Sequence, residues 1–336
     1  MTTTPEHPPN RGPRDGGEEF GIVVGVDGSA DSHHALQTAA KEALRRDLPL
    51  TMICNYSLHP SSDSARQAGQ GLAPESTLRQ HCEETLEEAR TTFLAEHTGP
   101  VRSLVRFGDP ARLLVDCSPR ATRLVVGTRG LGGFVGRVVG SVSSALPEYS
   151  ACPTLIVPSL EESPEAATDE APTHERTVTV GLDGSEHSLS AALEAAREAE
   201  ERHLPLHLLR AIPPVRSIFS WHPQDAELES MEASLTTELQ GDREWLQSHF
   251  PRLDVQTSSA QGGAVDALAE DNHRARLTVL GAAGRGGYLG RRLGSTTRGL
   301  INRARNPVLV VPYRHDRRIQ DRQQFPGGAE LIPADE

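Results

Sequence analysis

The sequence predicts an α/β protein made of two tandem doubly wound domains. Three observations predict it: apolar runs of strand length alternate with segments of helical period, this order occurs twice, and one glycine-rich stretch follows the fourth run of each half. Continuous apolar runs are typical of strands covered on both faces, as in a parallel sheet. We expect five parallel strands in each half, in the order 3-2-1-4-5, with flanking helices.

The first half begins with a polar segment and then follows strand and helix in turn. Residues 1–18 are rich in proline and glycine, which predicts disorder. The apolar run at 21–26 is the first strand, and side chains within 29–32 are N-cap candidates for a helix whose apolar period runs over 35–46. The other predicted elements are strands at 50–54, 101–106, 124–127 and 153–157 and helices at 75–96, 111–117 and 142–149.

The second half repeats this order after an acidic, proline-containing stretch at 159–175, which we interpret as a linker. Residues 19–158 and 176–312 therefore form the two predicted domains, and the charged residues 313–336 predict a loose tail. The predicted elements of the second domain are strands at 177–182, 206–211, near 255, 277–281 and 307–311 and helices at 188–202, 226–249 and 265–272.

One glycine-rich stretch occurs in both halves. Residues 127–141 and 281–295 both read Gly, two residues, Gly, nine residues, Gly-Ser, directly after the fourth apolar run. The two copies are separated by 154 residues, and the Asp-Gly-Ser tripeptides that begin at Asp27 and Asp183 are separated by 156. A nearly constant offset across two independent motifs indicates tandem duplication.

Both motifs are expected at one edge of each sheet. Strands one and four are neighbours in the order 3-2-1-4-5, and ligands bind beyond their carboxyl ends. Glycines at such a turn let the backbone approach a ligand, and exposed amides at a helix start favour anions. We therefore interpret each glycine stretch as a phosphate-binding turn and each Asp-Gly-Ser as a second wall of the same pocket.

Other phosphate-binding and metal-binding motifs do not fit the sequence. A Walker loop needs Gly-Lys-Ser/Thr, and the single lysine, Lys41, is followed by Glu42. A protein kinase needs a second lysine, and a dinucleotide fingerprint follows strand one rather than strand four. The 14 histidines show no ligand spacing that recurs in both halves, so a metal-ligand set stays unknown.

Composition excludes several classes of partner. The net charge is -12, from 46 acidic and 34 basic residues, whereas a nucleic-acid-binding chain needs a basic surface. No apolar run reaches the length of a membrane span, and the N-terminus lacks the apolar core of a signal peptide. The four cysteines lie in the first half without C-x-x-C spacing, which is typical of reduced thiols. We expect a cytoplasmic protein with no nucleic-acid or membrane partner.

The two motifs together resemble the ATP-binding branch of the universal stress protein family, over about residues 19–158 and 176–312. The resemblance implies a Rossmann-like domain with a five-stranded parallel sheet in each half. It implies an adenine nucleotide as partner, with ATP as cofactor, usually together with a divalent cation such as Mg²⁺. It also implies that the fifth strands pair, here Thr154–Val157 with Val308–Val311 within one chain, and it leaves a further homodimer open.

Carried over to this sequence, the resemblance assigns ligand contacts in both halves. Asp27 and Asp183 would approach the adenosine, and backbone near Ile53 and Leu209 would border the adenine, while the glycine stretches would hold the ribose and phosphates. The implied nucleotide-binding residues are Asp27, Gly28, Ser29, Ile53, Gly127, Gly130, Gly140, Ser141 and Val142 in the first half and Asp183, Gly184, Ser185, Leu209, Gly281, Gly284, Gly294, Ser295 and Thr296 in the second.

Two arginines depart from the family pattern. Members often carry an acidic residue just before strand four, where this chain has Arg123 and Arg276. We expect these arginines to alter surface contacts more than the pocket.

Three functions stay open at the level of the sequence. The first is an ATP-binding regulator in stress response or in the control of growth and dormancy. The second is an enzyme that hydrolyses ATP slowly or phosphorylates itself at Ser141 or Ser295, and the third is a scaffold with vestigial sites. Related ATP pyrophosphatases use Ser-Gly-Gly-x-Asp-Ser after strand one, but residues 27–32 have the wrong first residue and the second copy loses the later Asp. We therefore predict no fast enzyme and no catalytic residues.

Overall fold

The computed structural model describes residues 19–57, 74–130, 139–159, 177–212, 225–284 and 293–328, without the side chains of 225–232. The segment predicted to be disordered (1–18), residues 160–175 of the predicted linker and residues 329–336 of the predicted tail lie outside this part. None of the helices described is both long enough and apolar enough to span a bilayer.

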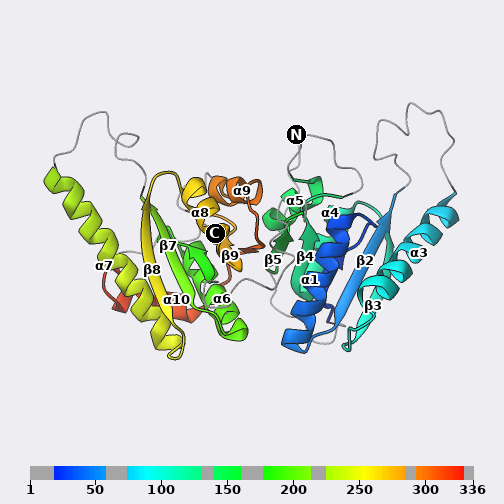
Figure 1. Cartoon of the computed structure of the whole chain (residues 1–336), viewed down its shortest axis with the longest axis horizontal. Coiled ribbons are helices and arrows are strands. Elements are labelled where there is room, and N and C mark those ends of the chain that lie inside the picture. Colours follow the sequence, from blue (N-terminus) through cyan, green and yellow to red (C-terminus); the bar gives the residue numbers. More distant parts are fainter. Residues whose placement is uncertain are drawn as a thin grey trace, which may run out of the picture.

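Strands and helices alternate in both domains, as the sequence predicts (Figure 1). The first domain consists of β1 (Gly21–Gly25), α1 (Ala30–Arg46), β2 (Leu50–Tyr56), α3 (Glu75–Phe93), β3 (Val101–Phe107), α4 (Pro110–Cys117), η1 (Ser118–Arg120), β4 (Ala121–Gly127), α5 (Ser141–Tyr149) and β5 (Thr154–Val157). The second domain consists of β6 (Val178–Gly181), α6 (Glu186–Arg202), β7 (Leu206–Ile212), α7 (Asp225–His249), β8 (Val255–Gln261), α8 (Ala264–Asn272), β9 (Leu277–Gly281), α9 (Ser295–Ile301) and β10 (Val308–Val311).

Local capping explains where the first helix of each domain begins. The Ser29 hydroxyl accepts a hydrogen bond from the Ser32 amide at 3.2 Å and caps α1. The helix therefore begins at Ala30, five residues before Ala35, where the predicted apolar period begins. In α6 the Ser185 hydroxyl accepts from the Ser188 amide at the same distance. The helix after each first strand is therefore held at a fixed point, directly beyond the Asp-Gly-Ser turn.

The strands form one continuous sheet of ten, in the order β3-β2-β1-β4-β5-β10-β9-β6-β7-β8. Each domain contributes five parallel strands in the predicted order 3-2-1-4-5, which is confirmed. The two fifth strands meet in the middle and pair antiparallel, with Leu309 opposite Leu155. Neither short, apolar fifth strand is left as an open edge, because each covers the other.

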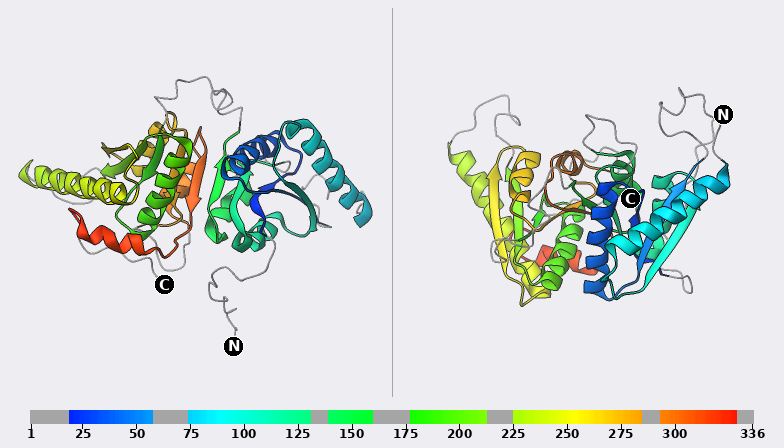
Figure 2. Two further views of the ribbon diagram at one scale, coloured as in Figure 1. Left: turned by 90° about the horizontal axis from the view of Figure 1, so that it is seen from below. Right: turned by 45° about the vertical axis from the view of Figure 1, so that its right-hand side comes forward.

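Helices cover both faces of the sheet, and each face has its own apolar core (Figures 1 and 2). Neighbouring residues of a strand point to opposite faces, so Val24 lies in one core and Val23 in the other. Helices α1, α3, α6 and α7 pack on the first face through residues such as Leu36, Leu86, Leu193 and Leu246. Helices α4, α5, α8 and α9 pack on the second through Leu114, Leu146, Leu268 and Leu300.

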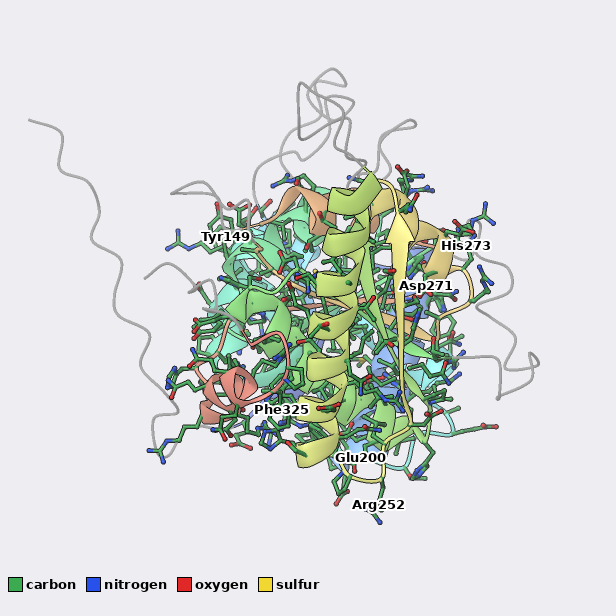
Figure 3. All side chains as sticks on the ribbon, turned by 90° about the vertical axis from the view of Figure 1, so that its left-hand side faces the viewer. Tyr149, Glu200, Arg252, Asp271, His273 and Phe325 are labelled. Carbon is green, nitrogen blue, oxygen red and sulfur yellow. The ribbon has the colours of Figure 1, made fainter. Side chains whose placement is uncertain are left out.

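The described segment after β10, residues 312–328, packs on the second domain, which corrects the prediction of a loose tail for residues 313–328. It contains α10 (Arg317–Asp321) and η5 (Arg322–Gln324). Ile319 is buried in the first core. Phe325, labelled in Figure 3, packs against the same core. The Arg322 guanidinium is also buried and contacts the Asp242 carboxylate of α7 at 2.5 Å. The composition of this segment predicts a solvated tail, because the sequence alone does not show which of its charged side chains form buried ion pairs.

A cluster of buried charges joins the two domains, and we call it the junction cluster: Glu42, Arg45, Arg46, Arg123, Glu194, Glu198, Glu201 and Arg202. Its centre is Arg123 of β4, whose side chain has no exposed surface. This corrects the expectation that Arg123 alters surface contacts. The guanidinium is buried because α6 of the other domain supplies the carboxylates of Glu194 and Glu198 near the start of β4.

Candidate functional site

The turn after β1 is organised by one carboxylate oxygen. Asp27 Oδ1 accepts hydrogen bonds from the Ser29 amide at 3.0 Å and from the Ser29 hydroxyl at 2.6 Å. Gly28, between them, has a φ of 86°, a left-handed conformation that favours glycine. The turn therefore fixes Asp27 at the carboxyl end of β1 while starting α1.

The second domain repeats this turn at the same distances. Asp183 Oδ1 accepts from the Ser185 amide at 3.0 Å and from its hydroxyl at 2.6 Å. Gly184 has a φ of 80°. The two Asp-Gly-Ser turns are thus equivalent in structure as well as in sequence.

The glycine turns face these aspartates directly. A Cβ on Gly130 would collide with Asp27 Oδ2, and a Cβ on Gly284 would collide with Asp183 Oδ2. The first glycine of each turn is equally confined, because a Cβ on Gly127 would lie 2.7 Å from the Asp31 carbonyl oxygen. The topology therefore brings together two loops that are about a hundred residues apart in sequence, as we predicted from the strand order.

In each domain one backbone amide and one hydroxyl group hydrogen-bond the end of the glycine turn to the residues just after the fourth strand. The Gly140 amide donates to the Thr128 carbonyl at 2.7 Å, and the Ser143 hydroxyl donates to the Gly127 carbonyl at 2.6 Å. In the second domain the Gly294 amide donates to the Ala282 carbonyl at 2.7 Å, and the Thr297 hydroxyl reaches the Gly281 carbonyl at 2.9 Å. These contacts hold the start of α5, or α9, beside the end of the fourth strand.

In the first domain the two loops enclose a cavity of about 520 Å³ beyond the carboxyl ends of β1 and β4. Gly28 and Ser29 lie outside its lining and shape the turn instead. The predicted residues in the lining are Asp27, Ile53, Gly127, Gly130, Gly140, Ser141 and Val142.

In the second domain the structure brings the equivalent residues together in the same way. The Leu182 amide donates to the Leu209 carbonyl at 2.9 Å, as the Val26 amide does to Ile53. Gly294 is the N-cap of α9, so Ser295 and Thr296 are its first residues. The middle of each glycine stretch (131–138 and 285–292) lies outside the described residues.

Several residues that line the cavity escaped the sequence interpretation. They come from β2 and α3 and are Cys54, Asn55, His81, Cys82 and Thr85. Burial raises the pKa of Cys54, and its neighbour Cys82 raises it further, so this thiol stays protonated. No repeated motif marks these positions. By contrast, the hydroxyls of Ser143 and Thr297 recur two residues after each Gly-Ser, a signal the sequence did offer.

The two sites are not identical. In the first domain Asp31 Oδ2 accepts from the Thr128 hydroxyl at 3.2 Å and from the Arg129 amide at 3.1 Å, which ties α1 to the glycine turn. The residue equivalent to Asp31 in the second domain is His187, and alanines replace Thr128 and Arg129. The carboxylate contact is therefore specific to the first site.

The groups that line the site are suited to binding a ligand. Among the described residues no group of three or more His, Cys, Asp or Glu side chains is placed to hold a metal ion. What the site offers is backbone amides at a helix start, one carboxylate and an apolar wall, a donor set suited to a phosphate-bearing ligand.

Comparison with known proteins agrees with this arrangement. The universal stress protein family model matches residues 21–158 and 175–312. A universal stress protein of Mycolicibacterium smegmatis is 32% identical over 303 residues, which span 87% of this chain and 97% of that protein. A universal stress protein of Mycobacterium tuberculosis is 31% identical over 305 residues, spanning 88% and 97%.

A solved structure is similar in fold over both domains. The crystal structure of a universal stress protein from Archaeoglobus fulgidus matches with a TM-score of 0.62 at 18% identity, over 88% of this chain and 100% of that one. Both halves of the present chain thus match the same family, and the similarity to a solved structure covers both domains. The chain belongs to the universal stress protein family and carries two of its domains in tandem.

Proposed function

We propose that each domain binds ATP between its Asp-Gly-Ser turn and its glycine turn. The observation that most directly supports this is the position of Gly130 and Gly284. Any side chain there would collide with the carboxylate of Asp27 or Asp183. Glycine at these two positions lets the glycine turn approach the carboxylate closely, so that backbone amides and one carboxylate can face the same ligand.

The residues of the first site suit the chemical groups of ATP. Ile53, buried in the middle of β2, offers an apolar contact for the base. The Asp27 carboxylate is a hydrogen-bond acceptor of the kind that ribose hydroxyls require. The amides at the start of α5, near Ser141, favour phosphate groups. When bound, a divalent cation such as Mg²⁺ would be held largely by the phosphates themselves.

The proposed role of the nucleotide is regulatory. Binding to the folded state alone stabilises a protein, by about 2.7 kcal/mol at a ligand concentration of a hundred times Kd. A cytoplasmic protein of this kind would respond to the ATP level by a change in stability or conformation, which a partner in stress response or growth control could recognise.

Slow ATP hydrolysis or phosphorylation of Ser141 or Ser295 is the alternative. The observation that favours it is the location of Ser141, exposed in the lining of the cavity. Among the described residues, no histidine or carboxylate forms a hydrogen bond with this hydroxyl, which argues for a low rate.

The test is to denature the purified full chain and to identify and count the adenine nucleotide that it releases. We expect up to two equivalents per chain, and fewer for the Asp27→Ala and Asp183→Ala variants, each of which identifies its own site. Asp116→Ala is a matched control, since this carboxylate of α4 is 67% exposed and outside the cavity lining.

Two results would redirect the proposal. A chain that neither releases nucleotide nor binds added ATP in equilibrium dialysis would support the scaffold with vestigial sites. Release of ADP or AMP faster than about 1 per second, the low end of ordinary enzymes, would support the enzyme.

A further inference from the structure

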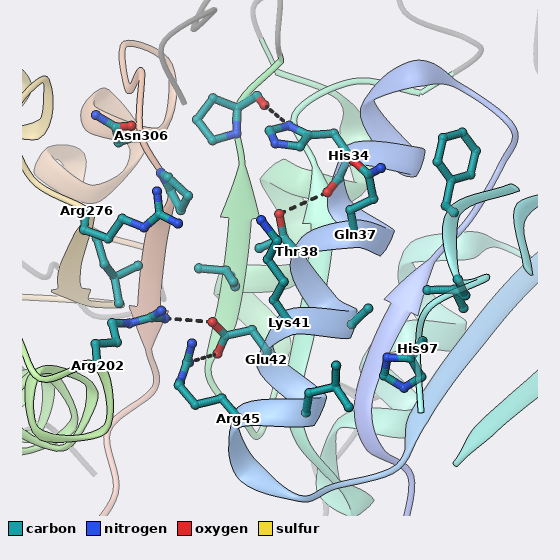
Figure 4. Close-up of a pocket in the computed structure, with 18 of the residues that line it drawn as sticks. His34, Gln37, Thr38, Lys41, Glu42, Arg45, His97, Arg202, Arg276 and Asn306 are labelled. Atoms are coloured by element: carbon teal, nitrogen blue, oxygen red, sulfur yellow. Dashed lines mark hydrogen bonds and ion pairs between the residues drawn. The ribbon is translucent and has the colours of Figure 1, made fainter. Parts of the chain in front are cut away.

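The buried charges described so far are paired with charges of the opposite sign. Beside the cavity between the domains, for example, the Glu42 carboxylate is contacted by Arg45 at 2.6 Å and by Arg202 at 2.7 Å (Figure 4). One network in the second domain is different, because it links a hydroxyl, an imidazole and a carboxylate in a row. Its members are Ser258, His207 and Asp271.

Two short contacts connect these three side chains. The Ser258 hydroxyl oxygen lies 2.7 Å from His207 Nε2. On the other side of the ring, His207 Nδ1 lies 3.0 Å from Asp271 Oδ1 (Asp271 is labelled in Figure 3). In a serine hydrolase the nucleophile, the general base and the orienting carboxylate are connected in this order.

The carboxylate determines which ring nitrogen is free to act as a base. Burial opposes ionisation of Asp271, but hydrogen bonding, first of all to His207, outweighs it and holds the pKa of Asp271 below its ordinary value. An ionised carboxylate can only accept a hydrogen bond, so in the neutral ring Nδ1 carries the proton. Nε2 then accepts from the Ser258 hydroxyl, as a general base must.

The fold brings the three residues together at one edge of the sheet. His207 is the second residue of β7, and Ser258 lies in β8, the last strand of the sheet. His207 shares a face of β7 with Leu209, which lies in the same core as Leu268 of α8. Asp271 comes from the last turn of α8. Two neighbouring strands and the helix that covers them thus each supply one member.

Ser258 is accessible to a small molecule. It is partly exposed, and its neighbours Thr257 and Ser259 are exposed. The side chains of His207 and Asp271 keep 17% and 21% of their surface exposed, so the contact between them is partly shielded from water. Within the described part of the chain no further strand covers β8, and a substrate can approach from that side.

A backbone amide at the same edge can stabilise developing negative charge. The Leu206 amide donates to the Asp254 carbonyl, and the Gly262 amide donates to the Ile212 carbonyl. In a parallel ladder with this register, the amides of even-numbered residues of β8 point to β7. The amide of Ser259, directly after Ser258, therefore points to the open edge. The amide after the nucleophile is a common oxyanion donor.

The first domain shows that the fold does not require this network. The equivalent positions, at offsets of 156, 154 and 154 residues, are Thr51, Leu104 and Cys117. Leu104 and Cys117 pack against the apolar core there, and the Thr51 hydroxyl donates to the Phe20 carbonyl at 2.7 Å. The same strands and helix pack without a hydroxyl–imidazole–carboxylate chain, so its presence in the second domain calls for another explanation.

We propose that Ser258, His207 and Asp271 form a reactive site that hydrolyses esters of small acyl groups. His207 Nε2 takes the proton of the Ser258 hydroxyl as Oγ bonds to the ester carbonyl carbon. His207 then gives this proton to the leaving alcohol oxygen as its bond to that carbon breaks, which leaves the acyl group on Ser258. Water releases the acid by the same two proton transfers and restores the serine. Asp271 is a positioning residue that acts through His207.

The surroundings of Ser258 determine the class of substrate. Thr257 and Ser259 are polar, so they present no apolar surface to a long acyl chain. The site is also separate from the proposed binding of ATP, because His207 lies near the start of β7, whereas the glycine turns follow the carboxyl ends of β4 and β9.

Labelling of the full wild-type chain with diisopropyl fluorophosphate tests the nucleophile. This reagent transfers its phosphoryl group to an activated serine and loses fluoride. We expect about one adduct per chain, which peptide mass spectrometry places on Ser258. The labelled protein should no longer hydrolyse p-nitrophenyl acetate.

Substitutions separate the three roles. Ser258→Ala should abolish labelling, and His207→Gln should slow it by about a hundredfold or more. Asp271→Asn should slow labelling by about as much but leave its final extent unchanged, whereas a damaged structure would lower the extent. Ser259→Ala is the matched control, since this neighbouring serine is exposed and its side chain points to the opposite face of β8. It should be labelled as the wild type is.

The proposal fails if no adduct forms or if the adduct lies on another residue. It also fails if Ser258→Ala hydrolyses p-nitrophenyl acetate as fast as the wild type, or if His207→Gln is labelled at the wild-type rate. The Asp27→Ala and Asp183→Ala variants should be labelled normally whether or not they bind ATP. Slower labelling of either variant would place the reactive serine in a glycine turn and would equally overturn the proposal.

Discussion

Arg123 of β4 and Glu198 of α6 form an ion pair between the two domains in which neither side chain has exposed surface. Glu42 contacts the same guanidinium from α1 at 2.7 Å. A buried charge is tolerated only with partners and hydrogen bonds, and removing one partner leaves the others uncompensated. This ion pair makes the stability of the chain depend on charges contributed by both halves.

Replacing Arg123 by leucine, the residue found at the equivalent position 277, should strongly destabilise the protein. Glu42 and Glu198 would each lose their fully buried partner, and we expect a loss of about 3–5 kcal/mol in the free energy of unfolding, measured in urea. Arg112→Leu is the control, since the Arg112 side chain is 84% exposed and its guanidinium lies 4.0 Å from the Asp116 carboxylate. A loss below about 1 kcal/mol for Arg123→Leu would contradict a structural role for the junction cluster.

Acid should weaken the same junction. Burial opposes ionisation of Glu42, but Arg123, Arg202 and Arg45 outweigh it and hold the pKa of Glu42 below its ordinary value of 4.5. A carboxyl whose pKa is lowered by folding contributes stability that is present above pH 4.5 and is lost as the pH falls toward the folded-state pKa. The free energy of unfolding should therefore drop between about pH 5 and about pH 3.

Glu42→Gln provides the comparison for this acid effect. The variant should be less stable than the wild type at neutral pH, and its stability should fall less steeply in acid. If the two proteins lose stability in parallel between pH 5 and pH 3, other carboxyls are responsible.

The first glycine of the turn should be far less tolerant than the last. A Cβ on Gly127 would lie 2.7 Å from the Asp31 carbonyl oxygen, which is backbone and cannot swing aside. We expect Gly127→Ala to cost about 1–3 kcal/mol through overpacking. At Gly140 the nearest atom would be 3.3 Å away and φ is -71°, so Gly140→Ala should cost less than about 1 kcal/mol. Thermal unfolding of the two variants would show which substitution costs more stability. Equal losses of stability would argue against the close approach of α1 to Gly127.

The C-terminal segment should behave as part of the second domain. Arg322→Ala would leave the buried Asp242 carboxylate without its guanidinium, for an expected loss of about 3 kcal/mol. The indole of Trp245, buried and hydrogen-bonded to the Arg318 carbonyl at 2.7 Å, should shift its fluorescence to longer wavelength as the segment detaches. Arg317→Ala, at an exposed position of the preceding helix α10, is the control. If Arg322→Ala changed neither the emission of Trp245 nor the free energy of unfolding, the C-terminal segment would not contribute to the stability of the second domain.

Much of the fold followed from local patterns. Apolar runs and helical periods identify the strands and helices, and the offsets of 154 and 156 residues identify the duplication. Alternating strands and helices predict a doubly wound sheet of order 3-2-1-4-5. In that order strands one and four are neighbours, so Asp27 and Gly130 are expected to lie close together. These features were predictable because periodicity and motif spacing are properties of neighbouring residues.

Other features depend on contacts between distant parts of the chain. Arg123 looks like a surface arginine until α6 of the other domain is placed over it, and Arg322 looks like part of a loose tail until Asp242 is found beneath it. Cys54 and Cys82 line the first site only because α3 packs on β2 there. Whether a charged side chain is solvated or buried is decided by the free energy of its partners, and those partners are brought together only by the folded sheet and its helices.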